Sequence, residues 1–440
     1  MEPMEGRSHS VTLEVEKCKG CTTCIRYCPT EAIRVRGGRA RINSDLCIDC
    51  GQCIRVCPNH AKQAVFDQLQ DSMGRFKYKV ALPAPTLYGQ FNNLDDIDFV
   101  LAGLLEMGFD AVFEVARAAE IVSDYSRKLM ETRALTYPVI SSACPAVVRL
   151  IRSRFPSLCT HVMSIKSPMH VAAALARTEA MEKTGLARDE IGIFFISPCP
   201  AKVTDAREPI GSMSSEVDCV VSVANIYKPL LLRMNKLKDG DPRHLASSGI
   251  MGISWATSGG EASALLEEKY LAADGIENVI KVLEELEDDK LSDISFIELN
   301  ACPGGCVGGA STLENPFVAK ARIQMLRRFL PVSRNKYEER EVPPHIVDWH
   351  FPLDEQPTEA LAEDISEAMR KMQEIERLTA ELPGLDCGAC GAPSCEALAR
   401  DVVAGRAKEN ACLFVLKHKL GELFEDAATD ALTDAEEDKK

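Results

Sequence analysis

The sequence predicts an α/β protein, with mostly parallel sheets and flanking helices, between two small cysteine-rich domains. Two observations lead to this prediction. Between residues 76 and 340, short β-branched or aromatic runs alternate with amphipathic helical patterns. On both sides of that region, cysteines recur at metal-ligand spacing. A chain of 440 residues is also long enough for two or three domains with a sizeable core.

Composition narrows the possible classes of protein. The chain has 18 cysteines, and in a reducing cytosol regularly spaced thiols bind metal more often than they form disulfides. The net charge of −15, without a cluster of basic and aromatic residues, argues against nucleic acid and anionic membranes as partners. The sequence lacks an apolar run of about 18 residues and opens without the layout of a secretion signal. We therefore expect a cytoplasmic protein, for which small redox proteins remain possible partners.

The amino-terminal region contains an internal repeat of cysteines. "CKGCTTCIRYCP" at 18–29 and "CIDCGQCIRVCP" at 47–58 share one spacing. The first three thiolates of such a run bind one 4Fe–4S cluster, and the fourth binds the other cluster. The predicted sets are Cys18, Cys21, Cys24 and Cys57 for the first cluster, and Cys28, Cys47, Cys50 and Cys53 for the second. Zinc knuckles are the alternative, but the doubled spacing favours an α+β bacterial ferredoxin-like domain over 1–75.

The central region, 76–340, reads as strands alternating with helices. The predicted strands cover 78–86, 111–115, 137–142, 191–197, 219–223 and 294–299, and clear helical patterns cover 94–109 and 171–185. Such alternation is typical of parallel strands covered on both faces. Ligands of these sheets bind beyond the carboxyl ends of the strands.

Four cysteines follow predicted strands of this region: Cys144, Cys199, Cys302 and Cys306. We expect them at the same end of one sheet, where four thiolates suit a 4Fe–4S cube. The competing interpretation is a nucleophilic thiol at Cys144 or Cys199, but neither local sequence supplies a base. The isolated Cys159 and Cys219 are expected to be buried apolar fillers.

Two further features accompany these cysteines. Glycines crowd around Cys306 in "NACPGGCVGGAS", and glycine is favoured where a backbone approaches a ligand closely. A ligand bulkier than a cube would explain them. Lys202, in "PCPAKVTD", is a compact positive charge suited to an anionic ligand. The alternative is a solvated surface lysine.

The segments "SSACPAVV", "SPCPAKVTD" and "ELNACPGGCVGGA" resemble, in order and separation, the three signatures of the iron-only (FeFe) hydrogenases. The stretches "GFDAVFEVARAAEIV", "KSPMH" and "SWATSGGEA" extend the resemblance over roughly 78–335. The resemblance implies an H-cluster, in which a 4Fe–4S cube joins a diiron unit that bears carbon monoxide, cyanide and a dithiolate amine. The implied cube ligands are Cys144, Cys199, Cys302 and Cys306, with Cys306 also bridging to the diiron unit. It also implies that Lys202 hydrogen-bonds a cyanide, and that H2, protons and maturation proteins are partners.

The chain departs from the family pattern around the implied cofactor. Most active members have a proton-shuttling cysteine where this chain has Ala143. The other departures are Asp124 and Arg127 at the aligned relay positions, Met163 for a hydroxyl, Ser197 and Asn300 for two methionines, Val147 for a tryptophan, and Asp205 for a glutamate. These changes predict slow turnover by another proton route, with Asp124, Glu120 and Glu298 as candidate acids. Neutral drift is the alternative.

The carboxyl-terminal part has a third group of cysteines. Residues 341–380 are predicted to form a linker and an amphipathic helix, and 423–440 an acidic tail. Between them, over 381–422, Cys387, Cys390, Cys395 and Cys412 have the spacing of a further 4Fe–4S site, with zinc as the alternative. This small helical domain resembles one found at the end of hydrogenases that are proposed to act as sensors.

Together these features lead to one functional expectation. The chain would be a slow iron-only hydrogenase, used for H2 sensing or redox signalling, with three 4Fe–4S clusters and an H-cluster. Lys202, Cys306, Asp124 and Glu298 are the candidate catalytic residues, and a ferredoxin-like or regulatory protein is the expected partner. The alternative is a non-catalytic iron–sulfur scaffold or electron-transfer protein that lacks the diiron unit.

Overall fold

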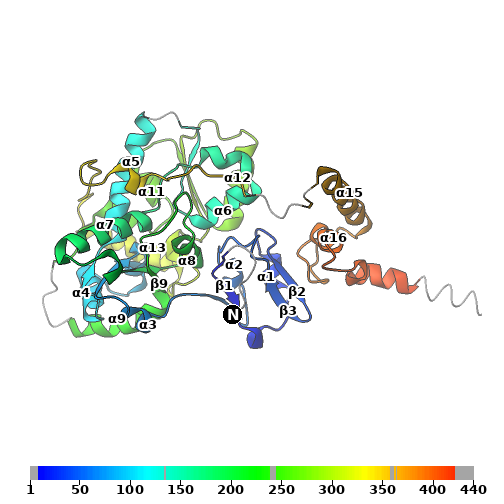
Figure 1. The fold of residues 1–440 in the computed structure, drawn as a ribbon, viewed down its shortest axis with the longest axis horizontal. Helices are drawn as coiled ribbons and strands as arrows, with labels where there is room; N and C mark the ends of the chain where they lie inside the picture. The colour runs from blue at the N-terminus through cyan, green and yellow to red at the C-terminus, as the bar shows by residue number, and fades with distance from the viewer. Residues whose placement is uncertain (1–7, 133–134, 238–243, 357–360, 363, 422–440) are drawn as a thin grey trace, which may run out of the picture. The chain divides into compact units, whose positions relative to one another are not determined.

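The structure, a computed structural model, describes residues 8–132, 135–237, 244–356, 361–362 and 364–421 (Figure 1). The predicted acidic tail, 423–440, lies outside the described residues. The chain divides into two compact units. Unit 1 comprises 1–12, 48–51 and 63–356, and unit 2 comprises 13–47, 52–62 and 357–440.

Unit 1 contains two parallel sheets. One has the order β6-β5-β8-β9, formed by Ala111–Val112, Tyr78–Pro83, Ile191–Ser197 and Cys219–Ser222. The other has the order β10-β11-β7, formed by Tyr270–Asp274, Phe296–Asn300 and Val139–Ile140. The α/β class with parallel sheets is therefore confirmed. The expectation of one sheet below all four thiols is wrong, because Cys199 follows β8 whereas Cys144 and Cys302 follow strands of the other sheet.

Helices cover both faces of the four-stranded sheet. Alternate residues of β5 and β8 point in opposite directions, so Val80 and Phe195 pack with α5 and α7, while Ala81 and Phe194 pack with α4 and α9. Strands buried on both faces are continuously apolar, which is why β8 reads "IGIFFIS". The bounds are Asp98–Glu106 for α4, Val115–Thr132 for α5, Pro168–Thr184 for α7 and Val223–Leu237 for α9.

The three-stranded sheet packs against α6 and α12, Pro145–Arg154 and Ile276–Glu287. The remaining short helices of unit 1 are α3 (Leu69–Met73), α8 (Pro200–Arg207), α10 (Ile250–Ser254), α11 (Gly260–Ala264), α13 (Pro316–Leu326) and α14 (Pro344–Val347). Its 3-10 turns are η2 (Pro85–Gln90), η3 (Pro156–His161), η4 (Arg188–Glu190), η5 (Cys306–Gly308) and η6 (Arg327–Phe329). Cys159 and Cys219 are buried in apolar clusters, as predicted.

The first part of the predicted linker packs onto unit 1. Val347 is fully buried, the Trp349 amide donates to the Ser164 carbonyl at 3.0 Å, and the Tyr125 hydroxyl donates to Asp348 at 2.7 Å. The apolar side chains of "VPPHIVDW" bury surface that a free linker would leave exposed.

Unit 2 contains the carboxyl-terminal domain and the cysteine repeat except for the segment 48–51, which includes Cys50 and is assigned to unit 1. The repeat forms two short helices, α1 (Thr23–Arg26) and α2 (Gln52–Arg55), after η1 (Val15–Lys17), and the antiparallel hairpin of β2 (Ile33–Arg36) and β3 (Arg39–Ile42). Strands β1 (Val11–Leu13) and β4 (Lys62–Ala64) pair at the boundaries of the two units. The carboxyl-terminal domain packs α15 (Ile365–Glu381) on α16 (Cys395–Val403), with η7 (Glu409–Ala411) following.

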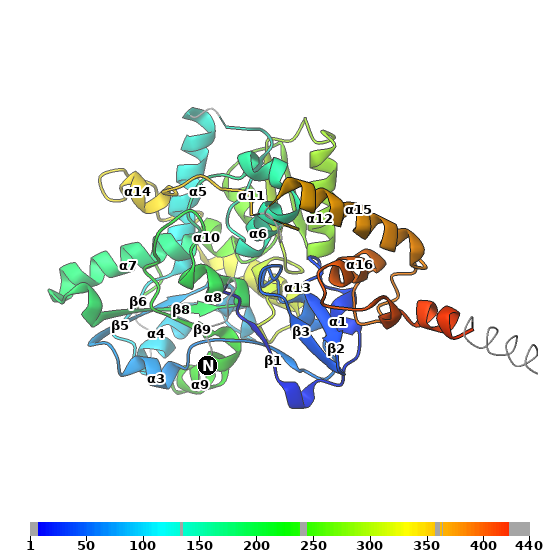
Figure 2. The same cartoon turned by 45° about the vertical axis from the view of Figure 1, so that its right-hand side comes forward.

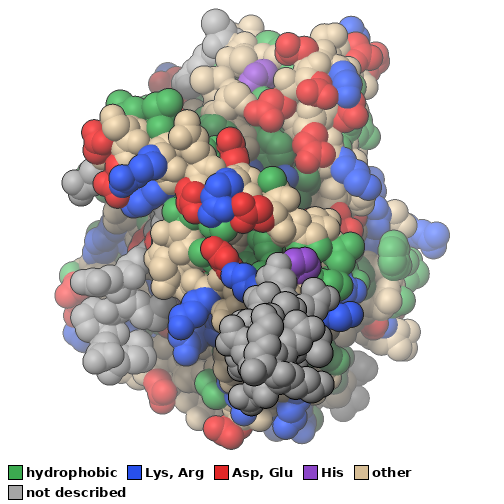
Figure 3. All heavy atoms as spheres, turned by 90° about the vertical axis from the view of Figure 1, so that its right-hand side faces the viewer, with side chains coloured by type: hydrophobic (Ala, Val, Ile, Leu, Met, Phe, Trp, Pro, Cys, Tyr) green, Lys and Arg blue, Asp and Glu red, His purple; other side chains and the backbone are tan. Residues whose placement is uncertain are grey.

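Surface charges of both signs mix on the face drawn in Figure 3, where red acidic and blue basic side chains are interspersed. None of the helices that the structure describes has the length and hydropathy needed to cross a bilayer.

Candidate functional site

Unit 1 contains a cavity of about 670 Å³ between its sheets and helices. Most of the lining is apolar and includes Met169 and Phe195. Polar chemistry is concentrated in a few side chains: the thiols of Cys144 and Cys306, the Lys202 amine, the carboxylates of Glu261 and Glu298, and the Asn300 amide. An apolar pocket with a few convergent polar groups is the usual form of a ligand site.

Two of the four predicted thiols are placed by Cys-Pro steps. Cys144 and Cys199 are the N-cap residues of α6 and α8, and each is followed by proline at the first helical position. Proline suits this position because its missing N–H would have no partner inside the helix, and its fixed φ begins the helix. Each thiol is therefore fixed where a strand gives way to a helix.

The other two thiols lie in the glycine-rich loop after β11. Gly305 has a φ of +93°, and a Cβ added there would lie 2.4 Å from the Ser258 nitrogen. A Cβ at Gly309 would lie 2.3 Å from the carbonyl oxygen of Pro198, next to Cys199. Only glycine lets this loop bring Cys306 so close to the chain that carries Cys199.

The thiols share one electrostatic environment. Burial, and then the charge of Cys302, raises the pKa of Cys144, and the same causes raise that of Cys199 to about 12. Burial and the charges of the other three thiols raise the pKa of Cys306. A thiol with a raised pKa makes a poor nucleophile, whereas a bound metal ion stabilises the thiolate outright. The geometry therefore favours ligation over the nucleophile interpretation.

Lys202 is a cavity residue and not a solvated surface lysine. Its side chain is 12% exposed, its Nζ donates to the Ala143 carbonyl at 3.0 Å, and it lies 3.9 Å from Asp205 Oδ2. Asp205 is buried, which opposes its ionisation, but His170, Lys202 and Arg149 together lower its pKa to about 2. His170 Nε2 lies 3.1 Å from that carboxylate. A cation held in this way can bind an anionic ligand.

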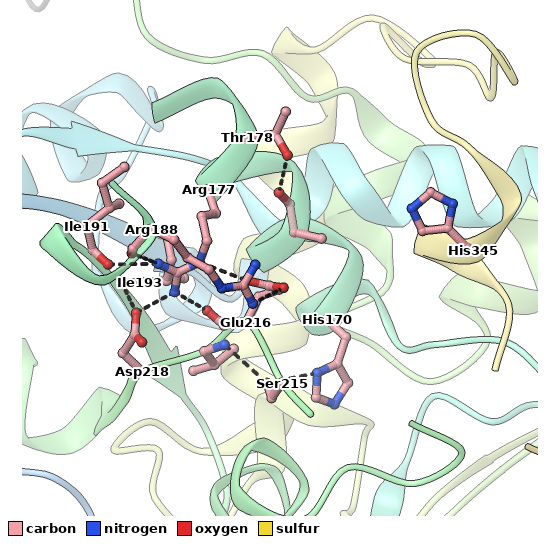
Figure 4. A network of polar contacts seen from close by, with 12 residues as sticks. His170, Arg177, Thr178, Arg188, Ile191, Ile193, Ser215, Glu216, Asp218 and His345 are labelled. Carbon is pink, nitrogen blue, oxygen red and sulfur yellow. Dashed lines mark hydrogen bonds and ion pairs between the residues drawn. The ribbon is translucent and has the colours of Figure 1, made fainter. Parts of the chain in front are cut away.

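A partly buried polar network supports His170 from outside the cavity (Figure 4). Ser215 Oγ lies 3.2 Å from His170 Nδ1, and Arg177 on α7 donates to the next residues, the Glu216 carbonyl and Asp218, at 2.8 and 2.6 Å. Arg177 also donates to the Ile191 carbonyl at the start of β8. The network therefore ties α7 to the strand that leads to Cys199.

Glu261 and Glu298 form a buried pair of carboxylates beside the cavity. Ser141 Oγ donates to Glu261 Oε2 at 2.6 Å, and the Ala143 amide donates to Ser141 Oγ at 3.1 Å. Glu298 accepts the Gly259 and Ala262 amides and the Asn300 side chain at 2.8–3.0 Å. Burial, and then the charge of Glu298, raises the pKa of Glu261 to about 8. Burial therefore favours the protonated form of a carboxyl group in this pair.

The other candidate acids hold loops. Burial disfavours ionisation of Asp124, but the Tyr337 amide, Arg127 and Lys128 lower its pKa, with Arg127 at 2.7 Å. Glu120 accepts the Gly249 amide at 2.8 Å and the Asn335 side chain. Neither acid is among the cavity-lining residues that the structure describes.

Three polar residues near the cavity were not predicted from the sequence: Glu261, Ser141 and His170. Ser197 was predicted as a residue beside the cofactor. The acid directly after the two glycines of "SGGEA" was the available signal for Glu261. Ser197 is fully buried, and its hydroxyl donates to the Cys199 carbonyl at 2.9 Å.

Unit 2 contains a cavity of about 310 Å³ lined by all four thiols of the first predicted set, Cys18, Cys21, Cys24 and Cys57. Burial opposes ionisation of Cys24 and, with the charges of Cys21, Cys18 and Cys57, raises its pKa to about 11. The repeat is visible in the backbone as well: Cys28 Sγ accepts the Ala32 amide at 3.2 Å, and Cys57 Sγ accepts the Ala61 amide at 3.3 Å. Burial, and then the charges of Cys28 and Cys24, raise the pKa of Cys53 to about 12.

The carboxyl-terminal cysteines also converge. Burial raises the pKa of Cys390, and the charges of Cys412 and Cys387 raise it further. Cys395 begins α16, and its amide donates to Asp386 at 2.6 Å. Four thiols suit either a 4Fe–4S cube or zinc.

Comparison with known families gives three matches. The model of the iron-only hydrogenase large subunit, C-terminal domain, matches 77–310, which is 234 of the 440 residues. A 4Fe-4S dicluster domain matches 10–58, and an Fe–S cluster domain matches 382–414. These matches coincide with the three groups of thiols.

Comparison with curated proteins gives relatives of two kinds. The periplasmic Fe-hydrogenase large subunit of Nitratidesulfovibrio vulgaris is 27% identical over 71% of this chain and 88% of its own length. Iron hydrogenase 1 of Clostridium pasteurianum is 24% identical over 74% of this chain and 70% of its own length. The cytosolic Fe–S cluster assembly factor narfl of Danio rerio is 21% identical over 52% and 68%.

Proposed function

Because the chain belongs to the iron-only hydrogenase large-subunit family, we propose that it interconverts H2 with protons and electrons, slowly, in H2 sensing or redox signalling. The cavity that joins thiols, a buried lysine and a pair of buried carboxyl groups carries this proposal. A cytoplasmic location and a redox or signalling protein partner belong to the same proposal.

The residues present fit the H-cluster of that family. Four thiols converge in unit 1. At Gly305, next to Cys306, the loop packs so closely against Ser258 that a side chain would not fit. Cys144, Cys199, Cys302 and Cys306 would hold this cofactor. When bound, the diiron unit would supply the metal at which H2 is cleaved heterolytically and an amine as the first base. The cavity outside the thiols is mostly apolar, which excludes water from that chemistry.

The chain's own residues divide the remaining work. Lys202, held by the Ala143 carbonyl and Asp205, presents a positive charge to the anionic ligands of the cofactor. Glu261 holds a proton at neutral pH. Because two negative charges would repel each other, Glu261 and Glu298 lose their protons in two separate steps that belong to the pair. The pair can therefore accept and release a proton at the edge of the cavity.

Ala143 explains the proposed low rate. An alanine carries no proton, so protons must cross the space between the cofactor and Glu261 without a side chain at position 143. The Ser141 hydroxyl donates to Glu261 and accepts the Ala143 amide, so it fixes Glu261 close to position 143 without being among the described residues that line the cavity. A low rate lets bound states persist, which suits a sensor.

The test is H2 oxidation and evolution by protein matured with the diiron assembly machinery. The proposal predicts activity that depends on maturation, is lower than in relatives with the shuttling cysteine, and is lost in Cys306→Ser. Turnover as fast as in those relatives would contradict the slow role. No activity at all, with the diiron unit present, would contradict the enzyme.

The second candidate is an iron–sulfur scaffold that never receives the diiron unit. The match to the Danio rerio assembly factor favours it. The Glu261–Glu298 pair and Lys202 argue for the hydrogenase, because a bare cube needs neither a proton carrier nor a cation in its cavity.

A further inference from the structure

Within unit 2, the carboxyl-terminal domain covers the edge of the hairpin formed by β2 and β3 (Figures 1 and 2). The Val35 amide of β2 donates to the Gly391 carbonyl at 2.8 Å. A Cβ at Gly391, which has a φ of +81°, would lie 1.9 Å from the Val35 carbonyl oxygen. The two backbones therefore meet in a way that only glycine permits, and the strand edge is paired instead of open.

A buried acid fixes this contact. Asp401 on α16 has a side chain that is 5% exposed, and its Oδ2 accepts Arg34 Nε at 2.7 Å and Arg36 Nη2 at 3.0 Å. Arg36 also donates to the Cys390 carbonyl at 2.6 Å. The Arg406 amide in turn donates to the Asp401 carbonyl at 2.7 Å. A shielded carboxylate shared by two arginines holds its partners more firmly than an exposed pair.

The contact brings two predicted metal sites together. Gly388 lies between Cys387 and Cys390, and a Cβ there would be 3.2 Å from Ile25 Cδ1 and 3.7 Å from the Thr22 Cβ. Thr22 follows Cys21 in the sequence, and Ile25 follows Cys24. A loop with two thiols of one set therefore packs directly against the segment Cys21–Ile25, which carries two thiols of the other set at the start of α1.

We propose that Asp401 docks the carboxyl-terminal domain so that its four thiols and the set of Cys18, Cys21, Cys24 and Cys57 form one electron-exchange pair. One electron passes at a time: one cube is oxidised by one electron, its neighbour is reduced by one, and no bond is made or broken. The external reactant is a one-electron redox protein.

The inference rests on the proposed function only in requiring 4Fe–4S cubes in both sets, and not in requiring the diiron unit. Chemically reconstituted full-length chain, without the diiron unit, is therefore sufficient for its test. Failure of hydrogenase activity and failure of this pairing are measured separately.

The experiment is electron paramagnetic resonance of the reconstituted, fully reduced chain, combined with hydrogen exchange of the Val35 amide. The native chain should show magnetic interaction between the carboxyl-terminal cluster and a cluster of the ferredoxin-like domain. Asp401→Asn should remove that interaction and speed Val35 exchange at least ten-fold, with the iron content unchanged. Glu396→Gln, which breaks an exposed pair with Arg400 on the same helix, should change neither readout.

Gly391→Ala provides a second route to the same result, because it leaves Asp401 intact and places a methyl group against Val35. Gly391→Ala should also remove the magnetic interaction. It therefore serves as the test if Asp401→Asn loses its iron. Zinc in place of the carboxyl-terminal cluster, no interaction in the native chain, or interaction and protection unchanged in both variants would each overturn the proposal.

Discussion

Replacing Glu261 with glutamine tests whether a proton is held beside the cavity at neutral pH. Burial and the nearby Glu298 raise the pKa of Glu261 from 4.5 to about 8. At about 1.4 kcal/mol per unit, this difference corresponds to roughly 5 kcal/mol between the two protonation states, as an upper bound for the pair. At pH 7 about ten molecules would then have Glu261 protonated for each one that has it ionised.

The sign of the pH dependence follows from the raised pKa. The folded chain binds this proton more tightly than the unfolded chain, so the associated stability is complete below pH 4.5 and is lost as the pH rises through about 8. Glu261→Gln cannot lose a proton and should flatten that part of the stability curve.

The assay is infrared difference spectroscopy of the carboxylic-acid carbonyl band, native chain minus Glu261→Gln, across pH 5 to 10. The band should disappear with a midpoint near pH 8. Asp124→Asn is the control, because interactions with Arg127, Lys128 and the Tyr337 amide lower the pKa of Asp124, and its removal should leave the band unchanged. A band that disappears below about pH 6 would refute the assignment of the proton to this pair.

Three further predictions follow from the same geometry. Glu298→Gln in matured protein should lower H2 turnover by about 10²-fold or more while the cofactor stays bound, because one half of the proton-accepting pair is lost. Steady-state rates and metal content distinguish slower turnover from loss of the cofactor, and an unchanged rate would contradict a role of Glu298 in proton transfer. Ala143→Cys should raise turnover by about 10²-fold, because it adds a proton-carrying thiol to the cavity that Glu261 and Glu298 also line; an unchanged rate would contradict the role of Ala143 in slow turnover. Phe194→Ala should destabilise unit 1 by about 3–5 kcal/mol, because the ring of Phe194 is fully buried and contacts Phe76 and Phe109. Chemical denaturation would show this loss as a lower midpoint, and a change below about 1 kcal/mol would contradict the core assignment.

Local patterns in the sequence were sufficient to predict much of this molecule. The β8 run and the Cys-Pro steps at Cys144 and Cys199 each depend on neighbouring residues, so strand ends and helix starts were readable. The division into two sheets was not, because strand order depends on pairing between distant segments. Strand β10 was missed because its residues are half-exposed and lack a continuous apolar run.

The candidate site shows the same limit. Metal-binding cysteines can be predicted from their spacing in the sequence. The role of Glu261 could not be predicted, because it depends on burial beside Glu298 and Ser141 in the fold. Conversely, Asp124 and Glu120 were plausible acids in the sequence, but ion pairs and loop amides occupy them in the fold.

We propose that the cavity of unit 1 holds a diiron unit and reacts with H2. The most direct measurement is the infrared spectrum in the carbonyl and cyanide region of protein matured with the diiron assembly machinery, recorded with and without H2. We predict carbonyl and cyanide bands that shift when H2 is admitted. Protein that keeps its iron–sulfur clusters but shows no such bands, or bands that H2 leaves unchanged, would contradict the claim.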